Sequence, residues 1–177
     1  MSVWSLIHVR LACLIPALML AVSPASEVGA QELYFIDGHS QVDRDVNAKT
    51  IIGNMKAAGV RRSILAVRAG RKPKFVIQLS AKFPQMIMPS VTTKMWGYIF
   101  DSKKPHKKYY KALKTQVGSG MFRAMSEVLM VHSDCPKAKC PPVRVPADDR
   151  RVTAALEAAV ANGWPFIPHI EFVTGFV

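Results

Sequence analysis

The sequence predicts an α/β fold built from parallel strands that alternate with helices. Short apolar runs alternate along the chain with segments whose apolar residues recur at helical spacing. The runs are almost continuously apolar, which is typical of strands that are covered on both faces of a parallel sheet. The length of 177 residues suits one domain, and the hydrophobic content of 50% excludes intrinsic disorder.

Five apolar runs predict the strands of this sheet. The first run is short and is followed by the polar stretch Asp37–Ser40, and the fourth contains Glu127 in an otherwise apolar segment. Each run has the length and the polar or turn-forming boundaries expected of a buried strand. In chain order, the predicted strands are residues 33–36, 63–67, 86–91, 122–131 and 166–172.

Four segments with apolar residues at helical spacing predict the connecting helices. Gly59 stands where the first of them would end, Pro84 ends the second, and Gly118–Gly120 closes the third, which is basic. Ala147–Asp149 offers N-terminal capping for the fourth, an alanine-rich helix that ends at Asn162–Gly163. The predicted helices are residues 46–58, 75–83, 107–117 and 152–161.

Single helices between consecutive apolar strands indicate parallel βαβ units. Such units build either a closed (β/α)8 barrel or an open, doubly wound sheet, and periodicity alone leaves both arrangements open. No Gly-x-Gly-x-x-Gly motif follows the first predicted strand, which argues against dinucleotide binding.

Residues 1–30 predict a secretory signal peptide. Arg10 precedes the apolar run Leu11–Val22, and the small residues that follow end in a candidate cleavage site, Val28–Ala30. The alternative is an uncleaved membrane anchor, but this run has 12 residues, whereas about 20 are needed to span a bilayer. We therefore expect a periplasmic or secreted protein whose domain is residues 31–177, with no membrane contact after the leader is removed.

The chain is basic, with 24 Lys and Arg residues against 12 Asp and Glu residues and a formal net charge of +12. This charge permits an anionic partner but does not determine the fold. The segment Lys103–Lys111 mixes basic and aromatic residues, and we interpret it as a solvated helix with inward-packed tyrosines rather than a nucleic-acid surface. In an oxidising compartment Cys135 and Cys140 are expected to form a disulfide or to remain thiols, and they make a poor zinc site.

Polar residues in or just after the predicted strands indicate a functional site. His39 closes the first strand, Glu127 lies in the fourth and His169 lies in the fifth. Enzymes of the α/β class place their chemistry at the C-terminal ends of parallel strands, and a buried carboxylate is costly unless it is paired or bound to a metal. For Glu127 the alternative is pairing with a nearby Arg or Lys, and for each histidine alone it is a structural role.

Two parts of the chain resemble the amidohydrolase superfamily. The stretch Ile36–Asp43 is similar to the motif of its first strand, where a His-x-His pair binds metal. Residues Phe122–Glu127 and Asp148–His169 resemble the amidohydrolase-related family in particular, so the resemblance covers about residues 33–172. It implies a (β/α)8 TIM barrel with one or two divalent metal ions, usually zinc, which activate water for attack on an amide, ester or lactone or assist a decarboxylation.

The resemblance also implies the metal ligands by position. His39 matches the first histidine of the pair, and Gln41 stands at the second position, where the family has histidine. Glu127 and His169 match the ligands of the fourth and fifth strands. Imidazole and carboxylate ligands suit zinc and leave a position for a reactive water. His132, just past the fourth strand, is expected either to support these ligands or to be a loop histidine.

The family pattern continues with a histidine on a sixth strand and an aspartate on an eighth, which serves as the general base. This chain offers five βα units, so we expect a partial barrel, a truncated product without that base, whose open strand edges permit self-association. The expected function is that of a metal-dependent hydrolase acting on a small molecule, compromised in catalysis. The alternative is a non-catalytic basic protein that binds an anionic partner.

Overall fold

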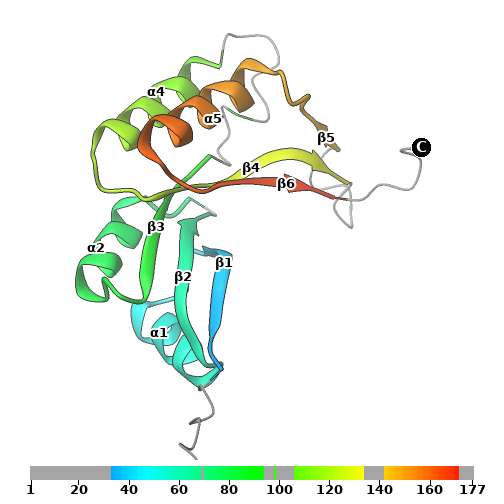
Figure 1. Ribbon diagram of the computed structural model, residues 1–177. Coiled ribbons are helices and arrows are strands. Elements are labelled where there is room, and N and C mark those ends of the chain that lie inside the picture. The colour runs from blue at the N-terminus through cyan, green and yellow to red at the C-terminus, as the bar shows by residue number, and fades with distance from the viewer. Residues whose placement is uncertain (1–32, 69, 94–97, 99–105, 134–141, 172–177) are drawn as a thin grey trace, which may run out of the picture. The chain divides into compact units, whose positions relative to one another are not determined.

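The computed structural model describes residues 33–68, 70–93, 98, 106–133 and 142–171. They form an α/β unit in which strands and helices alternate, which confirms the predicted class (Figure 1). The predicted signal peptide and the two cysteines of the predicted disulfide, Cys135 and Cys140, lie outside these residues. The elements are β1 (Phe35–Val42), α1 (Ala48–Ala57), β2 (Val60–Val67), α2 (Lys74–Lys82), β3 (Ile87–Val91), α4 (Lys107–Gly118), β4 (Ala124–His132), β5 (Val143–Arg144), α5 (Arg150–Asn162) and β6 (Phe166–Ile170).

Five strands run parallel in the order β1–β2–β3–β4–β6 and form a curved, barrel-like sheet (Figure 1). β3 pairs with the start of β4, where Ser90 lies opposite Ala124. β5 pairs antiparallel with the end of β4, where His132 lies opposite Val143. The parallel βαβ units are therefore as predicted, whereas β5 was not predicted because a strand of two residues carries no periodic pattern.

β1 is longer and more polar than the sequence predicts. It runs from Phe35 to Val42, so the prediction that this strand closes at His39 was wrong. Pairing with β2 keeps the polar residues extended, from Phe35 opposite Val60 to Val42 opposite Val67, with irregularities in the register. Backbone hydrogen bonds do not depend on the polarity of the side chain, so a search for apolar runs finds only part of such a strand.

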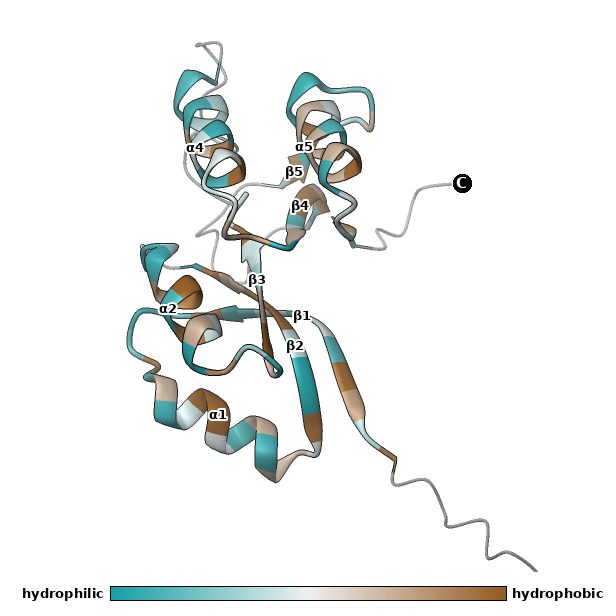
Figure 2. Ribbon diagram, turned by 60° about the vertical axis from the view of Figure 1, so that its left-hand side comes forward, coloured by the Kyte–Doolittle hydropathy of each residue, from teal (hydrophilic) through white to brown (hydrophobic). Residues whose placement is uncertain are grey.

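Each helix buries one side and exposes the other. In α4, Tyr109 and Leu113 are buried, whereas its lysines, Lys107, Lys108, Lys111 and Lys114, are exposed. Figure 2 shows α4 mainly in hydrophilic colours. The helix packs against α5. Among the described residues, no helix combines the length and the apolar character needed to cross a membrane.

Two tyrosines fill the space between α4, α5 and β4. Tyr98 and Tyr109 are fully buried, and their rings meet edge to face with centroids 5.0 Å apart. The Tyr98 hydroxyl donates to the Leu129 carbonyl at 2.6 Å, and the Tyr109 hydroxyl donates to the Arg151 carbonyl at 2.9 Å. Burial raises the pKa of Tyr98 to about 12 and also raises that of Tyr109. The prediction that tyrosine from the basic segment packs inward is thus confirmed for Tyr109.

The N-terminus of α5 is capped by Asp149, within the segment that the sequence predicts for this role. Its carboxylate accepts the Arg151 backbone N–H at 2.8 Å and the Arg151 guanidinium through both oxygens, each at 2.8 Å. The guanidinium also donates to the Tyr98 carbonyl at 2.7 Å, which joins the cap to the core. Hydrogen bonding to Arg151 lowers the pKa of Asp149 to about 2.

Replacing this cap should cost stability in a way that depends on pH. We expect Asp149→Ala to lower the free energy of unfolding by about 1 kcal/mol near neutral pH. The pKa of Asp149 falls from 3.8 to about 2 on folding, so the carboxylate's contribution is present above about pH 4 and is lost as the pH falls through about 2. Urea unfolding at a series of pH values measures this difference.

The neighbouring carboxylate provides the matched control. Asp148 is exposed and precedes the cap, so Asp148→Ala removes the same charge without removing the capping hydrogen bonds. We expect it to change the free energy of unfolding by less than about 0.5 kcal/mol. Equal destabilisation by the two substitutions would contradict the assignment of Asp149 as the cap.

Both outer strands of the parallel sheet expose apolar side chains. β1 and β6 stand at the two ends of the parallel strand order among the described residues. Phe35 and Ile36 of β1 are 66% and 62% exposed, and Ile170 of β6 is 61% exposed. Exposed, apolar edge strands are templates for pairing with another chain because their outward N–H and C=O groups remain available.

We therefore predict concentration-dependent self-association that a charge on β1 reduces. Ile36→Lys should shift the chain toward monomer because lysine on an edge strand opposes pairing. Val160→Lys is the control, since Val160 is 72% exposed on α5 and the change in charge is the same. Light scattering after size-exclusion chromatography reports the mass of each species. A sharp monomer of the unsubstituted chain at all concentrations would contradict the prediction.

Candidate functional site

Among the described residues, Glu127 is the one charged residue that is buried, with 7% of its surface exposed. One carboxylate oxygen, Oε2, accepts the Gln41 amide N–H at 2.7 Å and lies 3.7 Å from His39 Nε2. The other oxygen, Oε1, contacts Nδ1 of His169. Burial of a carboxylate is costly without such partners. These contacts are with one amide and two imidazoles. We call His39, Gln41, Glu127 and His169 the inner cluster.

The curvature of the sheet brings the inner cluster together. His39 and Gln41 lie two residues apart on β1, and both side chains reach Glu127, so they point to the same side of the strand. Glu127 is on β4, and His169 is on β6 beside it, where it lies opposite Leu129 in the register. β2 and β3 separate β1 from β4 in the sheet. Contacts between the side chains of β1 and those of β4 therefore require these two strands to face each other across the inner side of the curve.

Several hydroxyl and carboxylate groups hold His39 in place. Its backbone N–H donates to Asp37 Oδ1 at 3.0 Å, and the Ser63 hydroxyl of β2 donates to Asp37 Oδ2 at 2.6 Å. Its ring Nδ1 lies 3.2 Å from the Ser126 hydroxyl, which in turn donates to the Ser90 hydroxyl at 2.7 Å. His39 is therefore linked to β2 through its backbone, and to β3, β4 and Glu127 through its ring.

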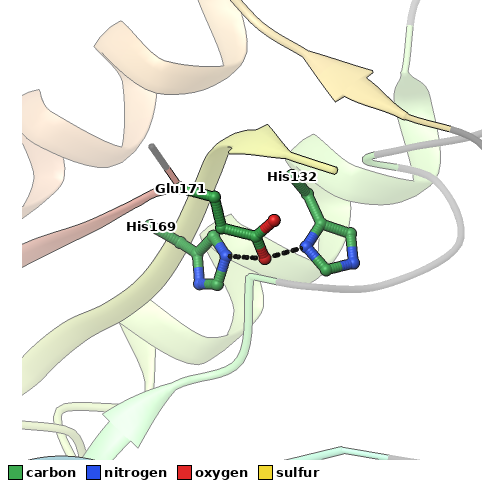
Figure 3. Close-up of side chains that lie close together, drawn as sticks. All are labelled: His132, His169 and Glu171. Carbon is green, nitrogen blue, oxygen red and sulfur yellow. Dashed lines mark hydrogen bonds and ion pairs between the residues drawn. The ribbon is translucent and has the colours of Figure 1, made fainter. Parts of the chain in front are cut away.

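A second group of side chains lies on the solvent side of His169. We call His132, His169 and Glu171 the outer cluster (Figure 3). Glu171 Oε1 lies 2.9 Å from Nε2 of His169 and also contacts Nδ1 of His132. The two imidazole rings meet edge to face with centroids 5.5 Å apart. His169 thus belongs to both clusters, with one ring nitrogen toward each.

Glu171 is held in its ionised form. Its Oε2 accepts the Ser133 hydroxyl and also the Ser133 backbone N–H, the latter at 2.6 Å. These two hydrogen bonds, followed by the one with His169, keep the pKa of Glu171 well below its usual range. The carboxylate is therefore a fixed negative charge at physiological pH, and its Oε1 is directed at the two histidines.

The outer cluster could hold a metal ion. One ligand atom from each of its three residues lies within 4.8 Å of the others, and it is the one such group of three His, Cys, Asp or Glu residues in the part of the chain that the structure describes. Two imidazoles and one carboxylate are a common ligand set for divalent transition metals and leave coordination positions for water or substrate.

The structure places the residues singled out in the sequence as follows. His39, Gln41, Glu127 and His169 are in contact with one another through Glu127. Gln41 acts here as a hydrogen-bond donor to Glu127. Metal binding by these four residues stays a prediction. His132 ends β4 rather than following it, and it contacts Glu171 of the outer cluster.

Sequence reasoning missed Glu171. This residue follows β6 directly, and its backbone N–H donates to the Val131 carbonyl at 3.0 Å, which continues the pairing with β4. The signal was present in the sequence, since His169 and Glu171 are two residues apart and residues at this spacing share one face of a strand. The predicted strand 166–172 includes both residues.

No protein-family model, curated protein or solved structure matches this chain. The resemblance to the amidohydrolases therefore rests on the sequence stretches quoted above.

Proposed function

We propose that this chain is an exported, zinc-dependent hydrolase of the amidohydrolase-related type, acting on an amide, ester or lactone carbonyl of a small molecule. The observation that carries the proposal is the contact of Glu127 with both His39 and His169. The three residues come from three different strands, β4, β1 and β6. The resemblance assigns metal ligands to these three positions. Their meeting on the inner side of a parallel sheet supports that assignment.

The donor types of the inner cluster suit a zinc ion, although only the outer cluster, among the described residues, has three ligand atoms that all lie within 4.8 Å of one another. His39, Glu127 and His169 offer two imidazoles and a carboxylate, which are ligand types that zinc prefers. Gln41 donates to Glu127 at 2.7 Å and so orients the carboxylate. Hydrogen bonds from outside the ligand set, such as those that fix His39, hold ligands in one orientation and raise metal affinity.

When bound, zinc would polarise the carbonyl of the substrate and lower the pKa of the water that attacks it. The residues of this chain bind and orient the ion, and β1, β4 and β6 fix the positions from which they do so. The resemblance assigns the general base to an eighth strand, which is not among the strands described. We therefore propose that hydrolysis by this chain alone is slow.

The zinc affinity of variants of the inner cluster, compared with a control variant, tests the proposal. We expect His39→Asn and Glu127→Gln each to weaken zinc binding about tenfold or more, since each removes a ligand or its charge. His106→Asn is the control, because His106 lies before α4 with a left-handed backbone (φ 36°), a conformation that asparagine adopts well. Isothermal titration with a competing chelator measures the affinity.

Hydrolysis is the second readout of the same experiment. The zinc-loaded chain should hydrolyse an activated ester or lactone slowly, and removal of zinc by a chelator should abolish this activity. Zinc affinity that is unchanged in His39→Asn, or hydrolysis that survives chelation, would contradict the proposal.

A second candidate function follows from the exposed lysines of α4. Lys107, Lys108, Lys111 and Lys114 lie on one helix that contains no acidic residue. Such a surface suits a non-catalytic protein that binds an anionic partner by charge. Affinity for a polyanion such as heparin should then fall steeply between low and moderate salt and should fall further in Lys111→Gln with Lys114→Gln. Binding that is insensitive to salt would exclude this function.

A further inference from the structure

We propose that the outer cluster of His132, His169 and Glu171 is a divalent transition-metal site in its own right. The proposal goes beyond the function proposed above because His132 and Glu171 have no counterpart among the ligands that the resemblance implies. Only His169 is common to both clusters, and it presents Nδ1 to Glu127 and Nε2 to Glu171. A metal at the outer cluster would thus use the nitrogen that faces away from Glu127.

The positions of the donor atoms favour a shared cation. Oε1 of Glu171 contacts a nitrogen of His132 and a nitrogen of His169 at the same time (Figure 3). These contacts are hydrogen bonds or ion pairs, so an ion would take the place of the protons between the three donors, which all lie within 4.8 Å of one another. The Glu171 carboxylate brings negative charge to the group, which attracts a dication.

Each of two ligands is oriented by a group behind it. Ser133 donates its hydroxyl and its backbone N–H to Oε2 of Glu171, so Oε1 is the oxygen that faces the histidines. Glu127 contacts Nδ1 of His169, which leaves Nε2 on the side of the outer cluster. A carboxylate behind a metal-binding imidazole is a recurrent arrangement, because it fixes the ring and makes the opposite nitrogen a better ligand.

The backbone around the cluster is paired, and the cluster is open to solvent. β4 and β6 are in parallel register up to Val131 opposite Ile170. The next residues along the chain are His132, the last residue of β4, and Glu171, which follows β6. The side chains of His132, His169 and Glu171 are 23%, 25% and 28% exposed. An ion can therefore enter from solvent, and coordination positions remain for water.

Cobalt(II) titration of the full purified chain tests this site, with Co²⁺ as a visible probe for a zinc-like site. We expect saturable binding with d–d absorption bands, and we expect His132→Asn and Glu171→Gln each to weaken it about tenfold or more, as loss of a ligand should. The control His106→Asn should bind as the unsubstituted chain does. Ser133→Ala keeps all three ligands and should weaken binding less than Glu171→Gln.

Histidine nitrogen NMR identifies the ligands even where a variant folds poorly. Zinc added to the unsubstituted chain should shift a ring nitrogen of both His132 and His169. Unchanged cobalt affinity in both His132→Asn and Glu171→Gln, or zinc shifts that leave His132 unaffected, would overturn the proposal and leave the cluster as an ion pair of Glu171 with its histidines.

The two metal proposals fail separately. His39→Asn removes a side chain that belongs only to the inner cluster, whereas His132→Asn and Glu171→Gln change side chains that belong only to the outer cluster. Cobalt binding that depends on His132 but not on His39 would support the outer site and contradict the function proposed above. Dependence on His39 but not on His132 or Glu171 would do the reverse.

Discussion

The burial of one carboxylate, Glu127, is the constraint on which the rest of the site depends. A charged group inside a sheet is tolerated only when partners replace its lost water, and here the partners come from β1 and β6 rather than from β4 itself. β1 reaches β4 only because the sheet curves past β2 and β3. The contacts of this carboxylate therefore depend on the curvature of the sheet, and loss of either partner strand would remove part of the pairing of a buried charge.

His169 connects this buried group to solvent. Its ring lies between two carboxylates, with Nδ1 against Glu127 and Nε2 against Glu171. Such a chain of carboxylate, imidazole and carboxylate fixes the ring and couples the interior of the sheet to its rim. The Ser133 hydroxyl donates to Glu171 at the outer end of this chain. At the inner end, the Ser126 hydroxyl lies 3.2 Å from Nδ1 of His39, whose Nε2 lies 3.7 Å from Glu127. The site is thus a continuous polar network rather than a set of separate side chains.

Much of the fold could be predicted from the sequence because it is written in local patterns. Apolar runs and helical spacing predict the parallel strands and their helices, and the residue types of Ala147–Asp149 predict the capping segment of α5, in which Asp149 is the cap. The polar half of β1 could not be found in this way, since backbone pairing with β2 determines it. Of the site, His39, Glu127 and His169 stood out as polar residues among apolar strands. The direction of Gln41 toward Glu127 and the inclusion of Glu171 depend on contacts across the sheet, which no local pattern records.

The central claim, that His169 and the carboxylates around it form a metal site, is tested most directly by crystals of the full chain grown with zinc. Anomalous diffraction on either side of the zinc absorption edge locates the ion without assumptions about its ligands. The account predicts an anomalous peak about 2.0–2.1 Å from a ring nitrogen of His169. Ordered crystals in saturating zinc that show no peak there, with His169 still in contact with Glu127 and Glu171, would contradict it.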